Sequence, residues 1–211
     1  MARMTGTISA AALGDPRALY DGVAYDEDIG RSFEADAEEQ LRLRAMIRPG
    51  GRRELYLDHL HELADDTGAA LTFYHPKGFI AQWRAETRIV SGMPARITTP
   101  LPFTQSHYLT GLHEFGHVYQ ADLGGTSNHG VTPEGIYGEL MAHVWAFEHS
   151  KVLPIPDRDL EHARISLLFD ARENGWTGGS VADFLPAHLR NPYSEAFARL
   201  ERWQGSAGGD A

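Results

Sequence analysis

The sequence contains no cysteine. This absence excludes disulfide bonds, zinc sites built from cysteine, iron–sulfur clusters and catalysis by a thiol. Any bound metal ion would therefore have histidine, aspartate or glutamate ligands. The chain has 211 residues, of which 42% are hydrophobic, and is long enough to form one sizeable core.

Long apolar segments and an excess of basic residues are also missing. No stretch approaches about 18 uninterrupted apolar residues, so we expect no membrane-spanning helix. The N-terminal residues MARMTGTISAAALGDPRALY lack the apolar centre of a signal peptide, which makes the cytoplasm the expected compartment. The formal net charge is −10. We therefore expect no direct binding of nucleic acid through general electrostatic attraction.

The order of the predicted elements, a helix and a few strands followed by more helices, indicates an α+β fold. Helices are predicted over residues 32–46, 52–66, 106–123, 133–151, 157–174, 181–189 and 192–204, and strands over 69–74 and 95–99, with one or two more within 79–90. We expect a polar N-terminal extension over residues 1–50, a main domain over 51–156, a C-terminal helical region over 157–204 and a disordered tail over 205–211.

Residues 111–119 read GLHEFGHVY and carry two histidines with a glutamate between them. His113 and His117 are four positions apart, so on a helix they lie on one face and can bind the same ion. Glu114 is rotated by about 100° along the helix and can reach a water molecule on that ion without binding the ion. The pattern predicts two metal ligands and a general base, the chemistry of the HExxH motif.

Gly116 lies between the two histidines, although glycine is a poor helix former. Its position predicts a close approach of another backbone or of substrate. The strand expected over residues 96–98, just before this helix, could pair with an extended substrate.

A catalytic zinc site needs a third protein ligand and an open fourth position. One zincin subclass continues the motif with a glycine and a histidine, but Gln120 and Leu123 occupy those positions. Glu139 is the favoured third ligand because it begins an apolar helix, where a carboxylate is costly to bury unless it is paired or bound to metal. The alternatives are His129 and His143, with Glu134 and Glu148 as weaker candidates.

Two further residues, His143 and Tyr119, are candidates for the catalytic machinery. His143 lies one helical turn after Glu139, where it can hydrogen-bond a metal-binding histidine or the Glu139 carboxylate. It is equally consistent with the sequence that His143 is a half-buried histidine with its hydrogen bonds formed and a purely structural role. The oxyanion formed in peptide hydrolysis needs a donor besides the metal. The candidates for that donor are Tyr119, Tyr137, His129 and His143.

The run TGLHEFGHVYQ, followed by GELMAHVWAFEHSKVLP, resembles the ImmA/IrrE family of gluzincin-type metallopeptidases. In that family a helix with HELGH precedes a helix of the form E-x-x-A-N-x-F-A. The second run here carries Glu139, Ala142, His143, Trp145 and Ala146, so a histidine stands where the family usually has asparagine. The upstream segments LHELADDTGAALTF and ARITTP resemble the family's helix and strands before the metal helix. The resemblance covers residues 52–156.

The resemblance implies a zincin-like fold, in which a small mixed sheet packs on the HExxH helix and on a second metal-binding helix, with extra C-terminal helices. It implies Zn²⁺ bound by His113, His117 and Glu139, with Glu114 as the base. The implied activity is hydrolysis of a peptide bond in a specific protein, such as a transcriptional repressor or another DNA-binding regulator.

Two other interpretations come from different classes of protein. The segment SHYLTGLHEFGH, together with the ELMA helix, is also similar to the zincin domain of ArdC-type antirestriction proteins. That similarity implies a role in antirestriction or another association with DNA. A metal-binding interaction module without catalysis is the third interpretation.

Overall fold

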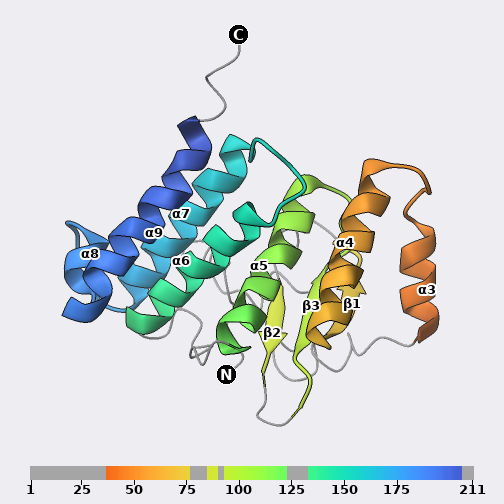
Figure 1. Cartoon of the computed structure of the whole chain (residues 1–211), viewed down its shortest axis with the longest axis horizontal. Helices are drawn as coiled ribbons and strands as arrows, with labels where there is room; N and C mark the ends of the chain where they lie inside the picture. Colours follow the sequence, from red (N-terminus) through yellow and green to blue (C-terminus); the bar gives the residue numbers. More distant parts are fainter. Residues whose placement is uncertain (1–36, 77–84, 90–92, 123–132, 206–211) are drawn as a thin grey trace, which may run out of the picture.

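The computed structural model describes residues 37–76, 85–89, 93–122 and 133–205. These residues form a mixed α+β fold with seven helices and one three-stranded sheet (Figure 1). None of these helices is both long and apolar enough to cross a membrane. Residues 1–36 of the expected N-terminal extension, and residues 206–211 of the expected tail, lie outside the described residues.

The first part of the described chain contains two helices and the three strands. They are α3 (Ala37–Ala45), α4 (Arg52–Thr67), β1 (Ala70–Tyr74), β2 (Glu86–Arg88) and β3 (Arg96–Pro100). Helix α4 ends at Gly68, which has a φ of 66° and donates its amide hydrogen to the carbonyl groups of the last turn. A left-handed glycine is a common way to end a helix. Of the region 79–90, where one or two strands are predicted, only residues 85–89 are described, and these contain β2.

The strands are ordered β1-β3-β2. β1 runs parallel to β3, with Ala70 opposite Arg96, and β2 runs antiparallel to β3, with Glu86 opposite Thr98. The prediction that residues 96–98 pair with an extended substrate is therefore wrong. Both edges of β3 already bond to neighbouring strands, so this strand has no edge to offer.

Helix α3 covers part of the outer edge of β1 through the side chain of Gln40. Its Nε2 donates to the carbonyl oxygen of Phe73 over 2.8 Å, and the Phe73 amide donates to its Oε1 over 2.9 Å. The side-chain amide thereby takes the place of a neighbouring strand. Leu43 and Ile47 of the same segment are buried in the hydrophobic core.

The second part of the described chain is helical. Its helices are α5 (Gln105–Asp122), α6 (Pro133–Glu148), α7 (Asp157–Glu173), α8 (Val181–Phe184) and α9 (Ala187–Gly205). Figure 1 shows α5 at the centre, between the sheet with α4 on one side and α6, α7 and α9 on the other. One core of buried apolar side chains extends from Leu43 in α3 to Leu200 in α9. Helix α5 is therefore enclosed on both sides.

Two predicted helix boundaries in the C-terminal region are wrong. The helix predicted over 181–189 ends at Phe184, and the next helix starts at Ala187 and continues through Pro192. Proline removes one amide donor from a helix and usually interrupts it. Here Tyr193 and Leu200 are buried and hold α9 against its neighbours, so packing outweighs the local effect of the proline.

Candidate metal centre

Helix α5 holds His113 and His117 in the interior of the protein. Tyr108, Leu112 and Phe115 are fully buried and seat the helix in the core. The two histidine side chains are themselves buried, and their Nε2 atoms lie 3.1 Å apart. The spacing of four residues thus places both imidazoles at one point, as predicted.

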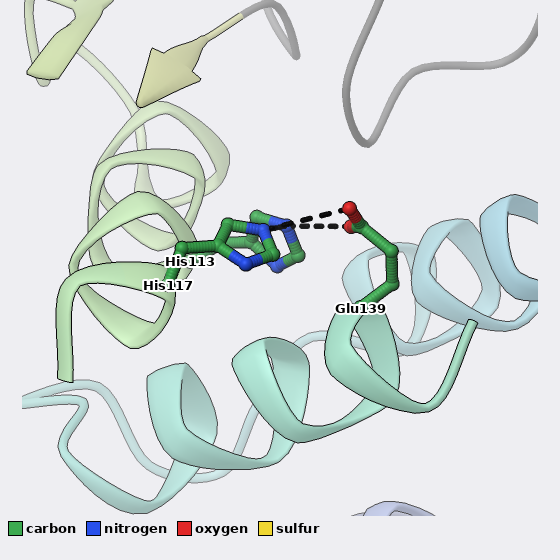
Figure 2. Close-up of side chains that lie close together, drawn as sticks. All are labelled: His113, His117 and Glu139. Carbon is green, nitrogen blue, oxygen red and sulfur yellow. Dashed lines mark hydrogen bonds and ion pairs between the residues drawn. The ribbon is translucent and has the colours of Figure 1, made fainter. Parts of the chain in front are cut away.

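Glu139 on α6 faces both histidines across the gap between the helices (Figure 2). Its Oε2 lies 3.1 Å from Nε2 of His113, and its Oε1 lies 3.6 Å from Nε2 of His117. Only 1% of Glu139 is exposed to solvent. Figure 2 shows the imidazoles pointing from α5 toward the carboxylate on α6. The three predicted metal ligands are therefore brought together.

The distances within this group fit a single metal ion. One ligand atom from each of the three residues lies within 4.8 Å of the others. In a tetrahedral zinc site with bonds of about 2.0–2.1 Å, ligand atoms are about 3.3–3.4 Å apart. The observed separations of 3.1 to 3.6 Å bracket that value. Burial supports the same assignment, because a carboxylate in the interior is stabilised by a cation.

The ligands of α5 and α6 meet because the two helices pack closely at Gly116. A Cβ atom on this residue would lie 2.9 Å from the Cα and 3.0 Å from the carbonyl oxygen of Ala142. Real Cβ atoms essentially never show the first of these separations, and the second is tighter than most, so only glycine fits without a shift of the helices. The prediction that Gly116 marks a close approach of another backbone is confirmed.

Gln120 lies on the same face of α5 as His117 and supports it. Its Nε2 donates to the carbonyl oxygen of Gly138 over 2.8 Å, which fixes the side chain between α5 and α6. Burial lowers the pKa of His117. The charge of Glu139, a hydrogen bond that its carboxylate accepts, the charge of Glu114 and a hydrogen bond with Gln120 more than offset this, so the net shift is upward. Gln120 follows His117 by three residues, so helical spacing alone could have identified it.

Glu114 is 1% exposed and is held by Thr87, a buried residue of β2. The Thr87 hydroxyl lies 2.7 Å from Oε2 of Glu114 and 3.2 Å from the carbonyl oxygen of the same residue. The hydrogen bond fixes the orientation of the carboxylate. No pattern in the sequence predicts Thr87, because it reaches Glu114 only through the packing of β2 against α5.

His143 lies beside the metal ligands but does not occupy the position of a ligand. Its ring is 4.2 Å from the ring of His113, between centroids. Burial, and then the charge of His113, lower the pKa of His143 well below its usual value, so the imidazole is neutral. Its Nε2 has no hydrogen-bond partner within the described ranges. His129, the other histidine considered as third ligand, lies outside the described residues.

The other candidates lie elsewhere. The Tyr119 ring stacks on Trp145, with centroids 4.8 Å apart, and neither Tyr119 nor Tyr137 lines the cavity next to Glu114. Glu134 is exposed, and Glu148 forms an ion pair with Arg199. The structure does not bring these residues to the metal ligands.

A cavity lies beside His113 and Glu114, and helix α7 contributes two polar residues to it, Asp159 and His162. Burial raises the pKa of Asp159. Burial, and then the charge of His113, lower the pKa of His162 to about 4. No pattern in the sequence predicts these residues, because α7 follows the metal helices and meets them only in the folded chain.

Asp170, further along α7, is another acidic residue close to the metal ligands. Burial, and then the negative charges of Glu139 and Glu173, raise its pKa to about 8, whereas His117 lowers it. A bound cation would oppose this upward shift because it favours the ionised carboxylate. Asp170 is thus an acidic group that a bound cation near the ligands would help to ionise.

Helices α5 and α6 supply the residues on which the resemblance to the ImmA/IrrE family and to ArdC-type proteins rests. These residues are His113, Glu114 and His117 on the first helix and Glu139 on the second. Comparison of the chain with protein-family models, with curated proteins and with solved structures finds no match.

Proposed function

We propose that this protein is a zinc-dependent metallopeptidase of the ImmA/IrrE type, with a zincin-like fold, that hydrolyses a peptide bond in a specific protein. The observation that carries the proposal is the convergence of buried His113, His117 and Glu139 on one point. Glu114 lines a cavity next to that point together with His113. Two imidazoles, one carboxylate and a nearby acid are the residue types that zinc peptidases use.

Zinc is the proposed ion because the group offers two histidines and one glutamate in a spacing that suits tetrahedral coordination. When bound, the ion would act as a Lewis acid that polarises the carbonyl group of the substrate and lowers the pKa of a water molecule to about 7. His113, His117 and Glu139 are the residues that would hold the ion.

Glu114 is the proposed general base. It accepts a proton from the attacking water while the oxygen of that water forms a bond to the carbonyl carbon. It then delivers the proton to the amide nitrogen, and the carbon–nitrogen bond breaks. Thr87 keeps the carboxylate in place through the hydrogen bond to Oε2.

His143 is the proposed donor to the oxyanion that develops on the carbonyl oxygen. His143 lines the same cavity as Glu114, and its buried Nε2 has no partner among the described residues. A preorganised donor in a site shielded from water stabilises such a charge strongly. Tyr119 remains a weaker candidate for this role, because its ring stacks on Trp145.

The proposed substrate, a transcriptional repressor or another DNA-binding regulator, rests on the resemblance alone. The test is to incubate the zinc-loaded protein with a peptide mixture and to identify new chain ends by mass spectrometry. We expect cleavage by the wild-type protein and no cleavage after chelation. The change Glu114→Gln should leave zinc bound and should reduce the rate by about 10²–10⁴-fold, the usual contribution of a general base.

The same variant separates the proposal from its alternatives. If Glu114→Gln retains the biological activity of the wild-type protein in cells, the protein acts as a metal-binding interaction module and not as a peptidase. If the wild-type protein is retained on DNA at moderate salt and cleaves no peptide, the similarity to ArdC-type proteins gives the better account.

A further inference from the structure

The cavity beside Glu114 is lined by polar groups that the proposed hydrolysis does not use. Helix α5 contributes Ser106, and helix α7 contributes Asp159 and His162. The cavity thus connects the proposed reaction centre with a helix that carries no metal ligand. A group of the substrate next to the cleaved bond could extend into it.

Asp159 is the acidic group of this cavity. Only 6% of the residue is exposed, and its Oδ2 has no hydrogen-bond partner within the described ranges. Arg158 forms a long ion pair with it: the Nε lies 3.7 Å from Oδ2, and the Arg158 side chain is 63% exposed. The buried Ser106 hydroxyl is near enough to lower the pKa of Asp159, but its Oγ also lacks a formed hydrogen bond there. Both oxygens can accept hydrogen bonds from a ligand.

The fold itself does not require a buried carboxylate at this place. A negative charge stabilises the first turn of a helix whether or not it is exposed. Asp157 is exposed in the same turn of α7 and already provides such a charge. Burial of the Asp159 carboxylate costs free energy unless a cation or several hydrogen-bond donors stabilise its charge. The net upward shift of its pKa is the expected sign of incomplete compensation.

The remaining polar groups suit the same kind of ligand. The imidazoles of His143 and His162 line the same cavity, and each ring offers a nitrogen to a bound group. The space of about 30 Å³ corresponds to one or two water-sized groups. A primary ammonium group is that compact, carries a positive charge and has three hydrogens to donate. A guanidinium group is larger and planar.

We propose that this cavity binds a primary ammonium group of the substrate, with Asp159 as the charged partner and Ser106 as a second acceptor. The ammonium belongs either to a lysine side chain next to the cleaved bond or to the free N-terminus of the peptide. The role of this group as part of a substrate rests on the proposed peptidase function, but the binding of an ammonium group can be tested without any cleavage.

The first test uses the zinc-loaded protein and small probes. n-Butylammonium imitates the lysine side chain, alaninamide imitates a free N-terminus, and n-butanol is the neutral control. We expect at least one of the ammonium probes to shift the ring resonances of His143 and His162 saturably in NMR spectra, and butanol to leave them unchanged. Equal shifts with butanol, or no shift with either ammonium probe, would overturn the proposal.

Variants of two neighbouring aspartates give the matched comparison. Asp159→Asn should weaken binding of the ammonium probe at least tenfold, because a charge-assisted hydrogen bond is lost. Asp157→Asn removes an exposed charge from the same turn and should leave the affinity unchanged. Equal weakening by both changes, or by neither, contradicts a specific role of Asp159. If Asp159→Asn does not fold, the comparison of the ammonium probes with butanol in the wild-type protein is by itself the test of ammonium binding.

The second test identifies the source of the ammonium group and keeps the two proposals apart. Three matched peptide libraries are used: N-acetylated peptides with lysine, N-acetylated peptides with acetyl-lysine, and lysine-free peptides with a free N-terminus. A rate at least tenfold higher for the first or the third library supports the inference and names the source. Equal cleavage of all three overturns it and leaves the peptidase proposal intact. Ammonium binding without cleavage of any library supports the cavity assignment and contradicts the peptidase.

Discussion

Gly116 on α5 lies so close to Ala142 on α6 that an added Cβ atom would be 2.9 Å from the Cα of Ala142. The atoms in the way belong mainly to the backbone, so no side-chain rotation can relieve the clash. The change Gly116→Ala should therefore push the helices apart and lower the free energy of unfolding by about 1–3 kcal/mol, although alanine is favoured in helices by about 0.8–1.0 kcal/mol. Urea denaturation of the metal-free protein measures this loss.

Gly138 on α6 provides the matched control for that change. A Cβ atom there would lie 3.5 Å from Oε1 of Gln120, which is an ordinary contact. Gly138→Ala should be neutral or should stabilise the protein by up to about 1 kcal/mol. If both alanine variants change the stability alike, close packing at Gly116 is not what holds the metal helices together.

Binding of the metal ion should depend on the Glu139 carboxylate. Glu139→Gln replaces an anionic ligand with a weakly binding amide, so the purified protein should lose its zinc during dialysis, as measured by elemental analysis. Glu134→Gln changes an exposed glutamate in the first turn of the same helix and should retain the metal of the wild-type protein. Retention of one equivalent of zinc by the Glu139 variant would rule out this residue as the third ligand.

Thr87 should affect the rate of hydrolysis and not the binding of metal. Thr87→Val removes the hydroxyl that contacts Oε2 of Glu114, and a hydrogen bond to a charged group contributes about 1.5–3 kcal/mol. We expect kcat to fall about tenfold to a hundredfold, with unchanged zinc content and a shifted pH profile of kcat. Thr87→Ser keeps a hydroxyl and should restore most of the rate. A serine variant as slow as the valine variant would point to packing and not to the hydrogen bond.

His107 should make the folded protein sensitive to acid. Burial lowers its pKa to about 4 from a usual value of 6.5. Between these values the unfolded chain binds a proton that the folded chain does not, so stability falls as the pH drops from about 6.5 toward 4. The glutamine of His107→Gln does not titrate, so the stability of this variant should fall less steeply with pH. The two slopes should differ by at most about 1.4 kcal/mol per pH unit. Urea denaturation at pH 7.5 and pH 5 in the presence of a chelator compares the two proteins, and parallel losses would contradict this role of His107.

The core of the site was predictable because its signals are local. The i,i+4 spacing puts His113 and His117 on one face of a helix wherever that helix lies. Glu139 stood out because the helix that carries it is otherwise apolar. The mixed α+β class and most helices followed from the same kind of periodicity.

The surroundings of the site were not predictable in this way. Thr87 reaches Glu114 from a short strand, and Asp159 reaches the cavity from a later helix. Only tertiary packing sets the positions of both residues. The central place of β3 depends on the pairing of strands that lie apart in the sequence, so an edge was predicted where none exists. Pro192 was the predicted start of the last helix, but α9 begins at Ala187 and continues through Pro192, because Tyr193 and Leu200 are buried.

The pairing of Gln40 with Phe73 has a consequence for shortened forms of the protein. A chain that starts at residue 51 would leave the amide and the carbonyl of Phe73 without the partners that α3 now supplies. Open strand edges of this kind template the pairing of one molecule with the next, which leads to aggregation. Helix α3 therefore protects this strand edge from pairing with a second molecule. Its removal should lower the solubility of the protein before it changes any other property.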